Sequence, residues 1–452
     1  MSHLANLFKV KEIRTRILFT LGMLVLYRVG HFIPIPGVNL QEFLSRMSSQ
    51  EGVGRLFLMM NVLTGGSLQT ATLFSLGVMP YISASIIFSL LTKVVPSLEK
   101  LAKEGASGQR KINQYTRLAT VGICVFQSWF VIFGTLKSGS SNLLHESVGA
   151  WWGLYIVVIM FALTAGTMFV MWIGEQITER GIGNGMSLII MAGIISSLYP
   201  SLGSYVSGTF DRSVWQSLLM FLGAWAVAVI AVVFTTKAQR RIPIQQAKHT
   251  RGRRVYGGQK HFLPFKINQA GVMPLIFGSA LLLIPTMLGQ VLGWRGLEDS
   301  FASQRGFWFV ASYVVLIYFF SFFWTSMMFQ PNDIANNLKE GGSFIPGIRP
   351  GKSTAEFLEH TMVRITLAGA TFLAVVAVLP SILGGGSAGT MDQVLIYFMS
   401  GTSILIVVGV ALDMVEKLNA MLVMRNYEAA VGGGGGESAE GQGLSGWGRR
   451  TT

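Results

Sequence analysis

The residues that could perform acid–base, nucleophilic or metal chemistry are scattered along this sequence. Its six histidines lie mostly between apolar segments, at His3, His31, His145, His249, His261 and His360. They do not have the spacing of a zinc site, and the sequence contains no phosphate-binding glycine loop or nucleophile elbow. The single cysteine, Cys124, excludes an intrachain disulfide. Because an enzyme needs converging polar groups, we predict no catalytic site, no metal and no cofactor.

Charged residues are rare within the long apolar segments. Arg28 lies near one end of the first segment, where its long side chain can reach the interface. Glu175, Glu179 and Arg180 gather at the end of another segment, where a surface network is expected. Ion-coupled transporters use charges at the centres of spans as relays, and segments three to ten contain none. We therefore expect apolar side chains to line any pathway, because a narrow apolar constriction dewets and blocks ions.

The composition is that of a membrane protein. Of the 452 residues, 51% are hydrophobic and only 12% are charged, against about 25% charged in an average soluble domain. The apolar segments have the length of about 20 residues that a helix needs to cross a bilayer. They cover residues 17–35, 78–91, 118–136, 152–173, 186–206, 215–236, 270–292, 307–329, 365–383 and 394–412. The sequence thus predicts an all-α polytopic membrane protein with ten transmembrane helices.

The basic residues predict the orientation. Most of the 35 Lys and Arg residues fall in alternate connecting segments, beginning with the residues before the first span. Because Lys and Arg accumulate on the cytoplasmic side, both termini are expected there. The first residues imitate a secretory signal, but no small-residue cleavage pattern follows, so we expect no cleavage.

Ten spans divide into five and five near residues 202–212. Because five is odd, the second half enters the membrane in reverse, which permits an inverted repeat with a functional site between the halves. We predict an N-terminal half over residues 1–206, a C-terminal half over 207–413 and a cytoplasmic tail over 414–452. The tail ends in a glycine-rich, flexible extension.

The second span is irregular. Its mainly apolar part, residues 81–91, is too short to cross a bilayer alone. Residues 63–80 before it carry no charge but many hydroxyl and small side chains, with Gly77 and Pro80 at the end. This pattern favours a short half-helix, a break and a second half-helix along a cavity. A proline kink in an ordinary span is the alternative.

Two connecting segments on the predicted cytoplasmic side are long and polar. Residues 237–266 hold nine Lys and Arg residues and no Asp or Glu, and their glycine pair Gly257-Gly258 can form a hairpin turn. The second segment covers residues 330–360. A polyanionic partner such as ribosomal RNA would use this positive charge, and anionic phospholipids are the alternative.

Six strings of residues, in order along the chain, resemble the signatures of the SecY/Sec61-alpha family. They are residues 33–37, 76–87, 109–117, 174–185, 252–256 and 344–351, and the likeness runs from about Arg14 to Ala429. The resemblance implies a ten-helix clamshell of two inverted halves, hinged near the loop between spans five and six. It also implies a protein-conducting channel of the bacterial inner membrane.

The resemblance assigns three groups of residues. The hydrophobic pore ring falls on Val78, Ile82, Met186, Ile190, Ile276 and Ile406. A plug helix at about residues 65–76 includes Gly65, Gly66, Ser67, Leu68, Thr70, Thr72, Leu73 and Phe74. The docking residues for the ribosome and the SecA motor are Arg240, Arg241, Lys248, Arg251, Arg253, Arg254 and Arg349. In the ring, Val78 and Met186 depart from the family's usual isoleucine, and both remain apolar.

The same resemblance implies partners. A passive channel would be driven by the SecA motor ATPase or by the ribosome, and SecE and SecG would be its small subunits. Signal sequences of preproteins would reach lipid through a lateral gate of spans two, three, seven and eight, and SecD/SecF and YidC are further expected partners. The alternatives are a small-solute secondary transporter, which would need buried charges, and a membrane enzyme, which would need a catalytic set.

Overall fold

The computed structural model describes residues 11–38, 71–132, 152–207, 212–246, 249–251, 254–256, 260–275, 306–383 and 401–432, with a few positions between 277 and 301. Most of these residues are helical. In chain order the helices are α2 (Lys11–Gly30), α5 (Met79–Val94), α6 (Pro96–Lys103), α7 (Ala106–Val131), α8 (Trp152–Arg180), α9 (Gly185–Ser207), α10 (Arg212–Lys237), α13 (Phe307–Met328), α14 (Pro331–Glu340), α15 (Lys352–Leu383) and α17 (Gly401–Gly432).

Helices cover much of the predicted spans, although the first helix ends at Gly30 and residues 31–35 of the first span are not helical. Every predicted span overlaps a helix, except residues 270–292, which the structure describes only in part. Among the described residues, Gly153–Arg180, Phe307–Glu340 and Lys352–Val378 are long and apolar enough to cross a membrane by themselves. The chain is thus a mainly helical membrane protein, and the ten spans remain a prediction.

The second span is interrupted at both ends. Turns occupy residues 71–78, and α5 begins with Pro80 in its first turn. The proline-kink alternative is therefore wrong, because Pro80 starts a helix, where its missing N–H costs no hydrogen bond. At the other end α5 and α6 meet at 98°. The bend falls at the extended residue Val95, since a residue before proline disfavours the helical conformation.

The basic segment after α10 folds into a β-ribbon. Its strands are β1 (Gln239–Gln246), β2 (His249–Arg251), β3 (Arg254–Tyr256) and β4 (Lys260–Lys266). β1 pairs antiparallel with β4, and β5 (Ser343–Phe344) adds to the other edge of β1 in the order β4-β1-β5. Because Arg251 pairs with Arg254, the chain reverses between those two residues. The turn expected at Gly257-Gly258 lies outside the described residues.

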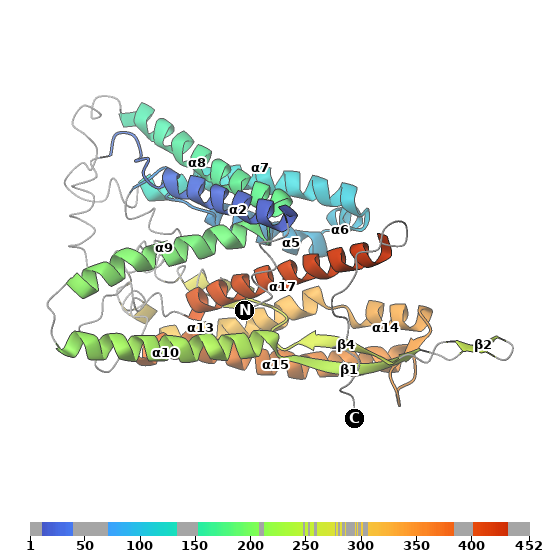
Figure 1. Cartoon of the computed structure of the whole chain (residues 1–452). Coiled ribbons are helices and arrows are strands. Elements are labelled where there is room, and N and C mark those ends of the chain that lie inside the picture. The colour runs from blue at the N-terminus through green and yellow to red at the C-terminus, as the bar shows by residue number, and fades with distance from the viewer. Residues whose placement is uncertain are drawn as a thin grey trace, which may run out of the picture.

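The helices pack in two groups. On one side α8 contacts α2, α7 and α9, and α5 contacts α7; on the other, α15 contacts α13, α14 and α17, and α10 packs against α17. Figure 1 shows the first group above the second, with α9 and α17 between them. The close packing of α9 against α17 joins the groups. The inverted repeat and the boundaries at residues 206 and 413 remain predictions.

Candidate functional site

Residues 71–78, here called the buried segment, lie against the chain that follows α2. The Ile35 N–H donates to the Ala71 carbonyl at 2.8 Å, and the Leu73 N–H donates to the Ile33 carbonyl at 2.9 Å. Ala71, Phe74 and the rest of the segment are buried, apart from the half-buried Leu73. These bonds attach the segment to the helix group of α2 and α8.

The predicted plug helix is not found in residues 71–76, the part of it that the structure describes. Residues 71–76, which include Thr72, Leu73 and Phe74, form turns and a bridge to Pro34 instead of an α-helix. The physical reason is that backbone groups of the segment bond residues 33–35 across the chain, while positive φ angles at Ala71 (44°) and Gly77 (54°) interrupt helical geometry. Five predicted plug residues lie outside the described residues, namely Gly65, Gly66, Ser67, Leu68 and Thr70.

Two glycines make room for the buried segment. The Phe74 ring lies where a side chain at Gly30 of α2 would be, and the Leu73 carbonyl lies where a side chain at Gly166 of α8 would be. Phe74 also stacks on Tyr27, with ring centroids 6.0 Å apart and 3° between the planes. The segment is thus seated directly on two helices, and any added methyl group there must displace it.

Four of the predicted pore-ring residues lie in one apolar cluster. Val78 and Met186 are buried within it, with 5% and 9% of their surfaces exposed, and the partly buried Ile82 and Ile190 pack against it. Phe74 belongs to the same cluster. We call Phe74, Val78, Ile82, Met186 and Ile190 the constriction cluster. It brings the end of the buried segment, α5 and the start of α9 together without a charged side chain among its five members.

The remaining ring positions are less closely defined. Ile406 is buried on α17, a helix that packs against α9. Val410 and Met414, further along α17, pack against the cluster that contains Val78 and Met186. Ile276 lies outside the described residues. The structure therefore brings Val78, Ile82, Met186 and Ile190 together and leaves the ring as a whole a prediction.

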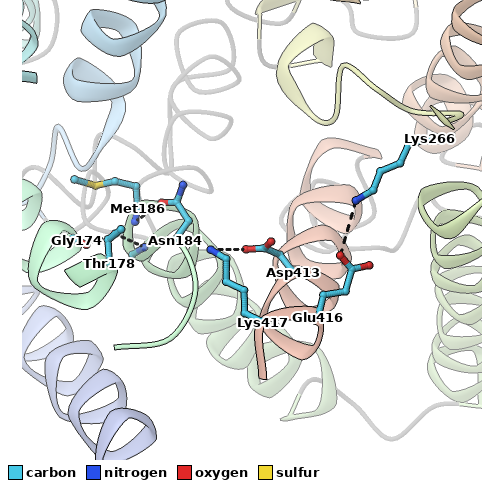
Figure 2. Close-up of polar contacts among 9 residues, drawn as sticks. Gly174, Thr178, Asn184, Met186, Lys266, Asp413, Glu416 and Lys417 are labelled. Carbon is cyan, nitrogen blue, oxygen red and sulfur yellow. Dashed lines mark hydrogen bonds and ion pairs between the residues drawn. The ribbon is translucent and has the colours of Figure 1, made fainter. Parts of the chain in front are cut away.

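The start of α9 is fixed by Thr178, near the end of α8, and by Asn184 of the turn between the two helices, as Figure 2 shows. The Thr178 hydroxyl donates to the Gly174 carbonyl and accepts from the Gly185 N–H, both at 2.8 Å. The Asn184 Oδ1 accepts from the Met186 N–H at 3.1 Å. Thr178 and Asn184 thus satisfy two of the N–H groups that a helix leaves unpaired at its start.

An ion pair joins α7 to α8 near the same place. Arg117 Nε donates to Glu175 Oε1 at 2.8 Å, and Arg117 Nη2 lies 2.8 Å from Glu175 Oε2. We expected Glu175 to join a surface network with Glu179 and Arg180. It instead makes two contacts with Arg117 of a different helix. Sequence patterns did not predict this partner, because Arg117 lies 58 positions away along the chain.

The predicted docking residues lie on or near the β-ribbon. Arg240 and Arg241 are exposed on β1, whereas Ile242 and Ile244 of the same strand are buried. Ile242 packs with Phe265 in a small core under the sheet. Figure 1 shows the β2–β3 end projecting away from the helices, and Arg251 and Arg254 pair there across the two strands. Lys248 and Arg253 lie outside the described residues.

Arg349 lies in the loop between β5 and α15. The residue is exposed, and its carbonyl accepts a hydrogen bond of 2.9 Å from the Thr354 hydroxyl. The nearby Ile345 is buried in the core beneath the sheet. A buried anchor therefore presents the Arg349 side chain on a defined loop.

The base of the β-ribbon touches two helices. The Ile267 N–H donates to the Ala238 carbonyl at 3.0 Å, closing the ribbon, and the Ile267 carbonyl lies against Gly369 of α15. Lys266 Nζ lies 3.8 Å from Glu416 Oε2 of α17, next to the Asp413–Lys417 pair at 3.3 Å (Figure 2). The ribbon is thus connected to the helix that carries Ile406.

Sequence reasoning missed residues that pack around the constriction cluster. Gly30, Gly166 and Thr178 have no catalytic, metal-binding or charged group, so the sequence alone did not single them out. The available signal was glycine inside a span, because glycine costs helix stability and small residues at helix interfaces allow close approach. Among the described residues, no group of three or more His, Cys, Asp or Glu side chains could hold a metal ion.

The chain is similar to known protein translocase subunits. A family model described as SecY matches residues 72–415. The protein translocase subunit SecY of Thermotoga maritima is 39% identical over 94% of this chain and 96% of its own length. The subunit of the same name from Streptomyces griseus is 41% identical over 94% of this chain and 98% of its own length.

Solved structures share the fold at low identity. A protein-conducting channel superimposes with a TM-score of 0.61 at 16% identity, covering 93% of this chain and 94% of the other. Sec61 from a canine ribosome–channel complex of the endoplasmic reticulum gives a TM-score of 0.54 at 14% identity, over 93% and 94% of the two chains. On the family match and on identities near 40% over nearly the whole length, the chain belongs to the SecY family.

Proposed function

We propose that this chain is the central subunit of a Sec translocon, a passive channel that moves unfolded preproteins across the inner membrane and releases transmembrane helices into lipid. The observation that carries the proposal is the constriction cluster, in which Val78 at the end of the buried segment meets Ile82, Met186 and Ile190. A narrow apolar constriction excludes ions at rest without binding them. It can also yield to a chemically varied polypeptide.

The proposed architecture has two inverted five-helix halves, with both termini in the cytoplasm. The two groups of packed helices joined through α9 and α17 support it. The proposed pore ring consists of Val78, Ile82, Met186, Ile190, Ile276 and Ile406, and the proposed plug covers residues 65–76. Seating on Gly30 and Gly166 would hold the described end of that plug in the closed state.

The proposed partners bind on the face that carries the β-ribbon. Exposed Arg240, Arg241 and Arg349 would contact the ribosome or the SecA motor, because clustered positive charge attracts polyanionic surfaces. SecE and SecG would be the small subunits, with SecD/SecF, YidC and anionic phospholipids as further partners. The energy for transport would come from these partners, since the chain acts as a conduit.

A small-solute transporter is the other function class considered. That alternative would use buried charged side chains as relays. In the part of the chain that the structure describes, the buried polar side chains are serines, threonines and His31. This observation does not favour the transporter, and we retain the channel.

Transport into reconstituted vesicles tests the proposal. Vesicles carrying this chain with SecE and SecG would receive SecA, ATP and a radiolabelled preprotein, and protected preprotein would be measured after protease treatment. We expect protection only when the chain, SecA and ATP are all present. Vesicles without the chain and preprotein lacking its signal sequence are the controls. Solute uptake without any preprotein, combined with no protected preprotein, would overturn the proposal.

A further inference from the structure

The junction between α8 and α9 is unusually close. A side chain at Gly185 would collide with the Gly174 carbonyl, and a side chain at Gly174 would lie only 2.5 Å from the Met186 Sδ. The Met186 thioether therefore lies directly on the backbone of α8. Because Met186 belongs to the constriction cluster, this contact decides where its side chain points.

The Thr178 hydroxyl holds this junction together. It bridges the Gly174 carbonyl of α8 and the Gly185 N–H of α9 with two bonds of 2.8 Å. Gly185 immediately precedes Met186, so the bridge ends one residue from the side chain that it would position (Figure 2). Methionine needs such a constraint more than isoleucine does, because it is unbranched and has three rotatable bonds.

We infer that Thr178 is a positioning residue of the constriction. Its hydroxyl holds the first turn of α9 against α8 and so keeps the Met186 side chain on Gly174 and inside the cluster. The inference rests on the proposed function only in treating the cluster as the channel's seal. The contacts that it uses stand independently of that role.

The turn on the other side of Thr178 is anchored separately. The Ile182 N–H donates to the Thr20 hydroxyl of α2 at 3.2 Å, and Ile182 packs with Ile13 and Leu418 in a small core. Loss of the Thr178 hydroxyl should therefore loosen the start of α9 without releasing the whole turn. The effect is expected at Met186 and not throughout the helix group.

The test measures the accessibility of position 186 directly. Met186→Cys is introduced together with Cys124→Ala in the full chain, reconstituted with SecE and SecG, and the rate of labelling by a water-soluble maleimide is followed. Adding Thr178→Val removes the hydroxyl at nearly constant shape. We expect labelling to become about tenfold faster, equivalent to ~1.4 kcal/mol. Thr178→Ser keeps the hydroxyl and should label at the parent rate.

A second reporter separates positioning from general loosening. Leu358→Cys, buried on α15 in the separate core beneath the β-ribbon, should label at the same rate with or without Thr178→Val. Equal acceleration at positions 186 and 358, or no acceleration at 186, would overturn the inference. Preprotein transport is measured on vesicles that carry the unsubstituted chain with the same small subunits. Absence of transport with selective acceleration at 186 would reject the proposed function and keep the positioning role.

Discussion

The constriction cluster and the β-ribbon are built on opposite physical principles. Around the constriction cluster the chain packs very closely. A ring or a backbone carbonyl from another segment occupies the space that a Cβ atom would need at Gly30, Gly166 and Gly185. On the ribbon, Arg240 and Arg241 extend into solvent from a strand held by a few buried residues such as Ile242. The first region is therefore sensitive to a single methyl group, whereas the second should respond mainly to charge.

The largest expected effect comes from polar groups in the constriction. Replacing the partly buried Ile82, together with Ile276, by Asn puts two polar side chains into the proposed pore ring and hydrates the pathway. Resting ion conductance of the reconstituted vesicles should rise by about 100-fold. The double change to Leu is the control and should leave the vesicles sealed. Unchanged conductance in the Asn variant would reject the ring assignment.

A methyl group under the buried segment should have the next largest effect. Gly166→Ala places a Cβ against the Leu73 carbonyl, and overpacking of this kind costs about 1 to 3 kcal/mol. We expect about tenfold more resting leak, because the segment must lift from α8. Gly153→Ala on the same helix is the matched control, since nothing lies within 4 Å of its added Cβ. Equal leak in the two variants would show that the segment does not seal the channel.

Charge reversal at Arg349 probes the second region. Arg349→Glu should slow SecA-driven secretion by about fivefold, or ~1 kcal/mol, the size typical of an exposed interface charge. Ribosome-dependent membrane insertion should change less. Lys352→Glu makes the same charge change at an exposed position three residues away and is the control. An equal loss of both activities would indicate damage to the fold or the pore instead of docking.

The smallest effect is expected for the contact between the ribbon and α17. The Lys266 and Glu416 side chains are both more than half exposed, at 56% and 55%, so their pair should contribute less than ~1 kcal/mol. Lys266→Ala should lower the apparent Tm of the detergent-solubilised protein by no more than Lys260→Ala, a control at the other end of β4. If the substitution lowered the free energy of unfolding by more than ~2 kcal/mol, and salt did not change that loss, the pair would behave as a buried contact like those of the constriction cluster.

The two regions also differed in how far the sequence predicted them. The spans and the basic segment were readable because burial in lipid imposes long apolar runs and charge patterning is local. The broken second span was predicted from residues 63–80, but the pairing of Leu73 with Ile33 was not. That pairing gave turns at residues 71–76 where the family resemblance implied a helix.

By itself the sequence determined a helical membrane chain, the location of its basic segments and the apolar nature of Val78, Ile82, Met186 and Ile190. Only the tertiary structure decided that these four side chains meet, that Gly30 and Gly166 seat the buried segment, and that Thr178 links α8 to the start of α9. The physical reason is the distance along the chain over which each property is determined. Hydrophobicity and charge belong to each residue, whereas close packing and hydrogen bonds depend on partners far along the chain.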